Sequence, residues 1–264
     1  MNKDLKQVNN IKRKSGFTLA EVFSVHPKDG HKQAFTLAEV LITLGIIGVV
    51  AAMTMPTLIQ KHQKKVTVTK LKKAYTTLAQ VIQKSYADNG SALDYLPAGE
   101  EISADVTENF FNTYYLPYFK STNILKRSTT GSGAIYYLMP NGISKYAVAI
   151  YTNFAAGRIF FSVNDGMTFF IISKTSQDIN DSIQFIYNLQ HYILVDINGF
   201  IKPNQLGKDV FLFTIDWSNN IVRPYGYNMD ITQINQNCSK TGDGSSCAAK
   251  IIADGWEIKG NYPW

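Results

Sequence analysis

The chain has 264 residues, 45% of them hydrophobic, which suits one core of moderate size together with a leader and a long helix. Its net charge of +6 is concentrated near the N-terminus: residues 1–34 carry seven Lys or Arg against three acids, residues 35–87 carry seven Lys against Glu39, and the remainder sums to −4. The basic residues therefore belong to an N-terminal stem, and because no aromatic residues alternate with these lysines, the composition does not favour a nucleic-acid partner.

A seven-residue motif occurs twice in the first 40 residues, as Gly16-Phe17-Thr18-Leu19-Ala20-Glu21-Val22 and as Ala34-Phe35-Thr36-Leu37-Ala38-Glu39-Val40. The first copy leads into Pro27, charged residues and Gly30, which excludes a membrane-spanning helix at that place. The second copy leads into a segment that has no charged side chain as far as Ile59. We therefore expect the second copy to be the functional one and the first to be a decoy.

Residues 40–59 are predicted to form a transmembrane helix, because about 20 apolar residues cross a bilayer core. The polar side chains of this segment belong to Thr43, Thr54 and Thr57. Their hydroxyls can bond to helix carbonyl groups. Glu39 lies at the mouth of the segment, where a carboxylate requires a partner. If the chain is cut between Ala34 and Phe35, the new α-amine lies one helical turn from Glu39 of the same or an adjacent subunit and can compensate its charge.

These residues resemble the prepilin leader and N-terminal helix of type IV pilins and type II secretion pseudopilins. The resemblance implies that residues 1–34 are a leader, that Phe35 becomes the methylated first residue, and that Glu39 guides subunit docking. It also implies that Pro56 kinks the helix. Ala34 departs from the family, which usually has glycine before the cut, so we expect slower cleavage there.

Two other interpretations of the N-terminal segment stay open. A secretory signal peptide would use Val50-Ala51-Ala52 as its small-residue cleavage site, but it leaves the preceding motif unexplained and would cut through one continuous helix. A single-span anchor that displays a surface binding module shares every feature except the need for Glu39.

A long helix is predicted over residues 35–90, and its second half is amphipathic. Apolar residues recur there every three or four positions, namely Val66, Leu71, Ala74, Tyr75, Leu78, Val81, Ile82 and Tyr86. Asp88-Asn89-Gly90 is a typical stop signal. Because a helix of this length exceeds the thickness of a bilayer, we expect its second half to pack its apolar stripe on the following domain.

Residues 91–264 are predicted to form a globular domain, and the fold class is α+β. A helix capped by Asp105-Val106-Thr107-Glu108 is expected to end at Pro117, with a core face of Phe110, Phe111, Tyr114 and Tyr115. Strands are predicted at residues 134–139, 145–151, 158–163, 167–173, 190–196 and 209–215. Asn164-Asp165-Gly166 predicts a hairpin loop, and residues 178–189 a helical or irregular insertion. As the pilin resemblance also implies, we expect the long helix to lie across an antiparallel sheet.

The two cysteines, Cys238 and Cys247, flank a flexible loop that contains two glycines. Such a loop can close into a disulfide in an oxidising compartment, and this would place the domain outside the cytoplasm. The alternative is two free thiols. A structural metal site lacks further ligands in the sequence.

A second candidate site lies in Asp196-Ile197-Asn198-Gly199 and the following Pro203-Asn204-Gln205-Leu206-Gly207-Lys208-Asp209. It collects oxygen ligands around a glycine turn, as calcium prefers, and Asp196, Asn198 and Asp209 are the candidate ligands. The segment begins like an EF-hand but lacks its next acidic residue and its closing Glu. It also resembles the calcium-stabilised loop of some major pseudopilins. The alternative is a simple turn in which Asn198 and Gly199 serve the backbone geometry.

No enzyme signature is present in the sequence. The histidines are His26, His31, His62 and His191. They lie in the leader, beside the membrane segment or in a predicted strand, and no Ser or Cys has the setting of a nucleophile. We therefore expect a structural protein that needs no cofactor apart from the candidate calcium.

By its resemblance, the chain is expected to be a subunit of a type IV pilus or a type II secretion filament. It would enter the cytoplasmic membrane with one span and its domain outside the cytoplasm. Its partners would be a prepilin peptidase, other pilin subunits, and an assembly platform with its ATPase. A single-span surface binding module and a minor pseudopilin of DNA uptake are the alternatives.

Overall fold

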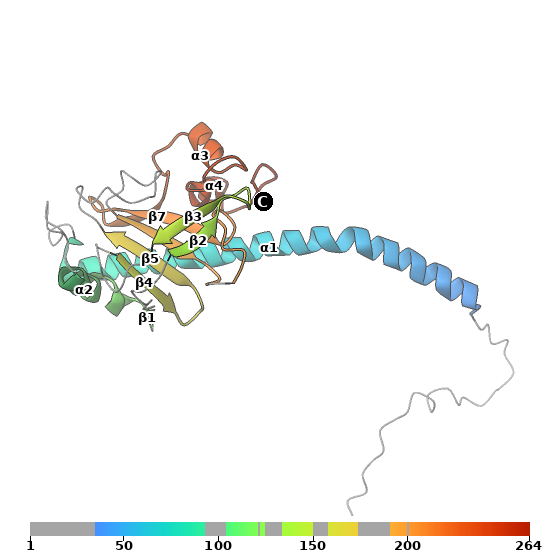
Figure 1. Cartoon of the computed structure of the whole chain (residues 1–264), viewed down its shortest axis with the longest axis horizontal. Coiled ribbons are helices and arrows are strands. Elements are labelled where there is room, and N and C mark those ends of the chain that lie inside the picture. The colour runs from blue at the N-terminus through green and yellow to red at the C-terminus, as the bar shows by residue number, and fades with distance from the viewer. Residues whose placement is uncertain are drawn as a thin grey trace, which may run out of the picture. The chain divides into compact units, whose positions relative to one another are not determined.

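The computed structural model describes residues 35–92, 104–120, 122–124, 134–149, 158–173, 191–199 and 201–264 (Figure 1). It divides into two compact units, Met1–Thr54 and Met55–Trp264. The expected leader and the expected insertion at residues 178–189 lie outside the described residues.

The long predicted helix is confirmed as α1, Leu37–Asn89, a single helix of 53 residues that runs through both units. Gly90 ends it in the left-handed conformation with φ 76°, and the Gly90 N–H donates to the Tyr86 carbonyl at 2.9 Å. Pro56 lies inside α1 and provides no N–H for the carbonyl one turn earlier.

In the second unit, α1 buries one stripe of side chains against the domain. Leu71, Ala74 and Leu78 are fully buried, and Val81 and Ile82 are nearly so. Two of the predicted stripe positions are wrong, because Val66 is 37% and Tyr86 47% exposed. Val66 and Tyr86 each lie one position outside the buried stripe, which corresponds to about 100° around the helix. The buried residues next to them are Thr67 and Ser85.

The sheet that receives α1 has six antiparallel strands in the order β1-β4-β5-β6-β7-β8. The strands are β1 Thr122–Ile124, β4 Arg158–Val163, β5 Thr168–Ser173, β6 His191–Asp196, β7 Val210–Asp216 and β8 Ile221–Pro224. The predicted hairpin between β4 and β5 is confirmed, since the Gly166 N–H donates to the Val163 carbonyl at 2.9 Å. All six predicted strands are present, whereas the short edge strands β1 and β8 lack a sequence signal strong enough to predict them.

Both faces of the sheet are covered, so β7 is a nearly continuous apolar run and not an alternating one. On one face Ile193, Phe211 and Phe213 belong to the same core as the α1 stripe. On the other face Leu194 and Leu212 pack in a second cluster with Tyr137. Tyr137 belongs to a separate hairpin, β2 Ala134–Leu138 and β3 Lys145–Ala149. The domain therefore has three layers: helix, sheet and hairpin.

The helix α2, Ala104–Tyr114, closes the C-terminal end of α1. It begins one residue before the predicted cap, so Asp105 lies in its first turn. Its four predicted aromatic residues are confirmed as buried, and Pro117 lies in the following short 3-10 helix, Leu116–Tyr118. Asn89 donates to the Thr113 carbonyl at 3.3 Å and to the Tyr118 hydroxyl at 2.8 Å, which connects the two helix ends.

Two short helices near the C-terminus were not predicted. Asp230 and Gln233 form a reciprocal capping box that starts α3, Ile231–Asn237, and α4 follows at Cys247–Ala253. With seven residues each, they are too short for a clear periodic pattern.

Candidate functional site

The N-terminal turn of α1 is built around Glu39. The backbone N–H and the hydroxyl of Thr36 both donate to Glu39 Oε2 at 2.8 Å, and the Glu39 N–H donates to Thr36 Oγ1 at 3.2 Å. This reciprocal pair is a capping box of the type Thr-x-x-Glu. The motif contains this capping signal, which was not among the predicted features. The pair satisfies two of the N–H groups that a helix start leaves open.

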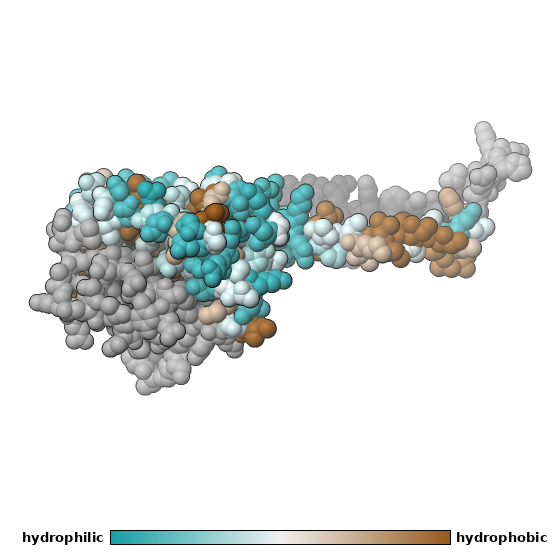
Figure 2. Space-filling model, turned by 90° about the horizontal axis from the view of Figure 1, so that it is seen from above, coloured by the Kyte–Doolittle hydropathy of each residue, from teal (hydrophilic) through white to brown (hydrophobic). Residues whose placement is uncertain are grey.

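The segment that follows Glu39 presents apolar side chains on every side. Its large hydrophobic residues, Val40, Leu41, Ile42, Leu44, Ile46, Ile47, Val49, Val50, Met53, Met55, Leu58 and Ile59, are each 40–74% exposed. Figure 2 shows them as the brown segment that precedes the polar part of the helix. Of the helices that the structure describes, α1 is long and apolar enough to cross a membrane, and none of its most apolar window is buried. An exposed apolar surface of this extent is typical of a segment that contacts lipid or other protein chains and not water.

Two of the three threonine hydroxyls inside this segment form hydrogen bonds within the helix. Thr43 Oγ1 donates to the Val40 carbonyl at 3.0 Å, and Thr54 Oγ1 donates to the Val50 carbonyl at 2.9 Å. These bonds conceal the polar atoms from a hydrocarbon environment. Phe35 is 85% exposed, while Ala34, on the other side of the expected cut, lies outside the described residues.

The three candidate calcium ligands come together in the turn between β6 and β7. The Asn198 N–H donates to Asp196 Oδ1 at 3.2 Å, and Asn198 Nδ2 donates to Asp209 Oδ2 at 3.3 Å. Backbone N–H groups of Asn204 and Gln205 also donate to Asp209. Asp196 and Asp209 are only 1% and 4% exposed, so two carboxyl groups are buried in one small turn.

Three oxygen atoms of this cluster are buried without a hydrogen-bond partner, namely Asp196 Oδ2, Asn198 Oδ1 and Asn204 Oδ1. A buried acceptor that has lost water and gained no donor costs free energy, and three such oxygens belong to residues of this one turn. No group of three His, Cys, Asp or Glu side chains in the described part of the chain could hold a metal ion. Any cation here would therefore depend on asparagine oxygens, among them that of Asn204, which lies within the predicted loop but is not one of the predicted ligands.

Burial, and after it the neighbouring charge of Asp209, raise the pKa of Asp196 to about 8, against smaller opposing effects of the Asn198 N–H, Lys70 and the Gly199 N–H. Burial also raises the pKa of Asp209, although its N–H donors oppose this change. The pKa of Tyr137 is raised by burial and by both carboxylates, which places the hairpin residue beside the cluster. The turn thus favours the protonated form of Asp196.

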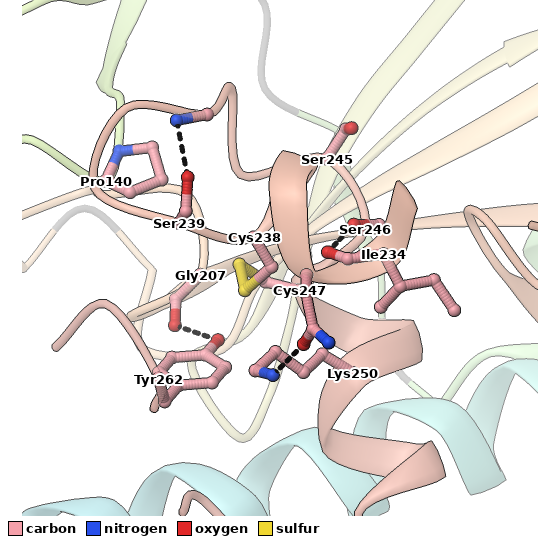
Figure 3. The surroundings of a disulfide bond; sticks show 12 residues. Pro140, Gly207, Ile234, Cys238, Ser239, Ser245, Ser246, Cys247, Lys250 and Tyr262 are labelled. Atoms are coloured by element: carbon pink, nitrogen blue, oxygen red, sulfur yellow. Dashed lines mark hydrogen bonds between the residues drawn. A yellow bond between two sulfur atoms is a disulfide. The ribbon is translucent and has the colours of Figure 1, made fainter. Parts of the chain in front are cut away.

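The predicted disulfide is confirmed and joins Cys238, just after α3, to Cys247, the first residue of α4 (Figure 3). Both cysteines are buried. Gly207 lies directly beneath, with φ 79°, and a Cβ at that position would come within 2.7 Å of Cys247 Sγ. The Tyr262 hydroxyl donates to the Gly207 carbonyl at 2.5 Å. Gly207, at the end of the turn between β6 and β7, is thus contacted both by the disulfide and by Tyr262 of the C-terminal segment.

Two family models match this chain, one for each of its two parts. The model described as "Family of unknown function (DUF6613)" matches residues 57–264, and the model of the prokaryotic N-terminal methylation motif matches residues 30–55. No curated protein and no solved structure gives a significant match. The methylation motif confirms the resemblance to type IV pilins and pseudopilins, and its range includes the motif copy at residues 34–40 but not the copy at 16–22.

The raised pKa of Asp196 predicts that the calcium-free protein loses stability as the pH rises. In the unfolded chain Asp196 loses its proton near 3.8, whereas in the folded chain it keeps the proton up to about 8. The folded state therefore binds the extra proton between these values, and the free energy of unfolding falls across this window. Asp196→Asn, which cannot ionise, should flatten the fall. Urea unfolding of the full chain in detergent with a chelator, at pH 5, 6.5 and 8, measures how the free energy of unfolding changes with pH.

The matched control for this prediction is Glu257→Gln, which removes an exposed carboxylate. It should keep the wild-type slope. An Asp196→Asn variant whose stability falls with pH as steeply as that of the wild type would contradict the prediction.

Proposed function

Because this chain belongs to the family of unknown function DUF6613 and carries the prokaryotic N-terminal methylation motif, we propose that it is a structural subunit of a pilus-like or pseudopilus filament. The observation that carries the proposal is the exposed apolar half of α1, which directly follows the motif. A surface of this kind needs either lipid or equivalent helices around it. Lipid would surround this surface in a membrane-inserted precursor, and the apolar helices of other subunits would surround it in a filament.

The proposed sequence of events begins with cleavage between Ala34 and Phe35 and methylation of the new amine. A prepilin peptidase would perform both steps, and an assembly platform with its ATPase would then extract the subunit from the cytoplasmic membrane. In the filament the apolar helices would bundle, and the α-amine of Phe35 would compensate the charge of Glu39 on the same or the next subunit. Pro56 would allow the helix to bend between the bundle and the domain.

The capping box refines the role of Glu39. A cap at this position needs only an oxygen acceptor, which Gln supplies as well as Glu. The negative charge is therefore not required for helix formation. Because the cap does not need this charge, its presence supports the proposed second role of Glu39, in which the charge selects an amine during subunit docking.

A calcium ion is a second, independent proposal for the turn between β6 and β7. Asp196, Asn198 and Asn204 would contribute their unpartnered oxygens, and Asp209 would add the second negative charge. Hard oxygen donors and flexible geometry are what calcium prefers. Because Leu138 and Gln205 contact one another across this turn, the ion would also fix the β2–β3 hairpin on the sheet.

The N-terminus of the mature protein tests the proposed processing. In cells that contain a prepilin peptidase, the N-terminal peptide should begin at Phe35 and carry one methyl group, as mass spectrometry can show. Ala34→Leu should block the cut by its size, Ala34→Gly should speed it, and Gly16→Ala should change nothing. A mature chain that begins at Phe17, or after Ala52 as a signal peptide would require, contradicts the proposal.

Two substitutions separate the cap from the charge of Glu39. Glu39→Gln should keep α1 intact but assemble about as poorly as Glu39→Ala, because both lose the negative charge. Crosslinking of subunits in the membrane and in sheared filaments measures assembly, and circular dichroism in detergent measures the helix. If Glu39→Gln assembles normally while Glu39→Ala does not, Glu39 acts only as a cap.

Calcium should raise the melting temperature of the full chain relative to a chelator. The rise should be larger at pH 8 than at pH 5, because a proton on Asp196 competes with the ion. A concentration of 100 times Kd would add about 2.7 kcal/mol to the free energy of unfolding. Asp196→Asn should abolish the rise. A melting curve that calcium leaves unchanged at both pH values contradicts the site.

A further inference from the structure

The charges of the mature stem are separated along the chain. Residues 40–87 contain seven lysines and no Asp or Glu. Residues 88–108 contain no Lys or Arg, and their six carboxylates belong to Asp88, Asp94, Glu100, Glu101, Asp105 and Glu108. Within a helix, lysines three or four positions apart repel each other when no acid lies between them. This repulsion between lysines destabilises the segment, and a negatively charged partner can offset it.

The lysines line a groove of about 920 Å³ between α1 and the C-terminal segment. Its charged lining residues are Lys61, Lys64, Lys65, Lys72, Lys73 and Glu257. Its apolar floor consists of Val68, Trp256 and Ile258. We call this surface, with its lysines and apolar floor, the basic groove.

Only part of this charge is compensated within the chain. Lys73 pairs with Asp165 at 2.9 Å, and the Lys72 amine lies 5.6 Å from the centre of the Trp256 ring. For Lys61, Lys64 and Lys65, no carboxylate in the described part of the chain lies within ion-pair distance. These three lysines lie within about one turn of one another, at the end of the groove nearest the apolar segment.

The opposite end of this stretch of α1 is acidic. Asp88 lies in the last turn of α1, and α2 packs against that end through Asn89. Asp105 and Glu108 are exposed on α2 and flank Val106, which is 41% exposed. We call Asp105, Val106 and Glu108 the acidic edge. Lys84 precedes Asp88 by one helical turn, whereas α2 itself carries no basic residue.

We propose that the basic groove of one copy of this chain binds the acidic edge of the next copy. Lysines around an apolar floor complement carboxylates around an exposed valine in both charge and polarity. Along α1, the groove lysines from Lys73 back to Lys61 lie about 22–40 Å from Asp88, at the end of the helix where α2 packs, at 1.5 Å per residue. One copy therefore cannot fill its own groove.

The contact is head-to-tail, and it rests on the proposed filament function. The same pair of unlike surfaces repeats from copy to copy, and such heterologous contacts produce open helical filaments when their rotation does not close a ring. Lipid phosphate is the competing occupant. It reaches Lys61 with ease, but Lys72 lies about 20 Å beyond Ile59, and a headgroup layer is only about 5–8 Å deep. A second copy can therefore contact the lysines along the whole groove, whereas lipid phosphate can reach only the lysines nearest the apolar segment.

Complementary charge reversal in the full chain tests this contact. One variant carries Lys61→Glu, Lys64→Glu and Lys65→Glu, and the other carries Asp105→Lys and Glu108→Lys. Each alone should form at least about tenfold fewer multimers than the wild type, because like charges then meet at the contact. Co-expression should restore assembly as an alternating copolymer, since each groove then meets an edge of opposite charge. The control variant is Lys240→Glu, an exposed lysine outside both surfaces, which should assemble normally.

A zero-length carbodiimide crosslink gives the second readout. In wild-type filaments, peptides that contain Lys64 or Lys65 should be joined to peptides that contain Asp105 or Glu108, and high salt before crosslinking should reduce their yield. Normal assembly of both reversed variants, or a failure of co-expression to restore it, overturns the proposed contact. Loss of binding to anionic vesicles by the groove variant, without restoration by its counterpart, assigns the groove to lipid. If the wild type itself forms no multimers, the filament function fails, and not this contact alone.

Discussion

The structure depends on one helix whose two halves are made for different media. As far as Ile59 the side chains of α1 are apolar on every face and exposed, and from Thr67 they are apolar on one face and buried. A helix satisfies its own backbone hydrogen bonds, so it can continue from one medium into another without a break. The domain uses the second half as part of its core, and it is thereby attached to whatever holds the first half.

The domain provides a core that does not depend on the membrane segment. Its sheet is covered by α1 on one face and by the β2–β3 hairpin on the other. Among the described residues, the hairpin forms one isolated bridge, from Leu138 to Gln205 in the loop before β7, and its Tyr137 is buried beside Asp196 and Asp209. The electrostatics of one small turn thus influence how firmly the third layer is held. The disulfide and Tyr262 close the same loop from the other side.

Glu39 illustrates how a local and a long-range explanation can apply to the same residue. The capping box with Thr36 accounts for its oxygen atoms, and any acceptor of that length would serve. The box does not account for a full negative charge at the mouth of an apolar segment. The same separation applies to the lysines of α1, whose aliphatic stems suit a helix surface and whose charges call for a partner outside the helix.

Local pattern was sufficient to predict from the sequence the long helix, the aromatic face of α2, six of the strands and the exposed apolar segment. Each of these depends on periodicity over a few turns or a few strand residues. The sequence also restricted the disulfide to one pair, because it contains only two cysteines. The edge strands β1 and β8 and the helices α3 and α4 are too short for such a signal, and Val66 and Tyr86 lie at the margins of a stripe whose width depends on the facing sheet.

Tertiary structure alone decided the strand order, the separation of the β2–β3 hairpin, and the return of Trp256 to the lysines of α1. It also decided which oxygens of the candidate calcium turn are left without a donor, and it added Asn204 to them. These features join residues that are far apart along the chain. Their proximity follows from how whole layers pack, and no local pattern of residues records that packing.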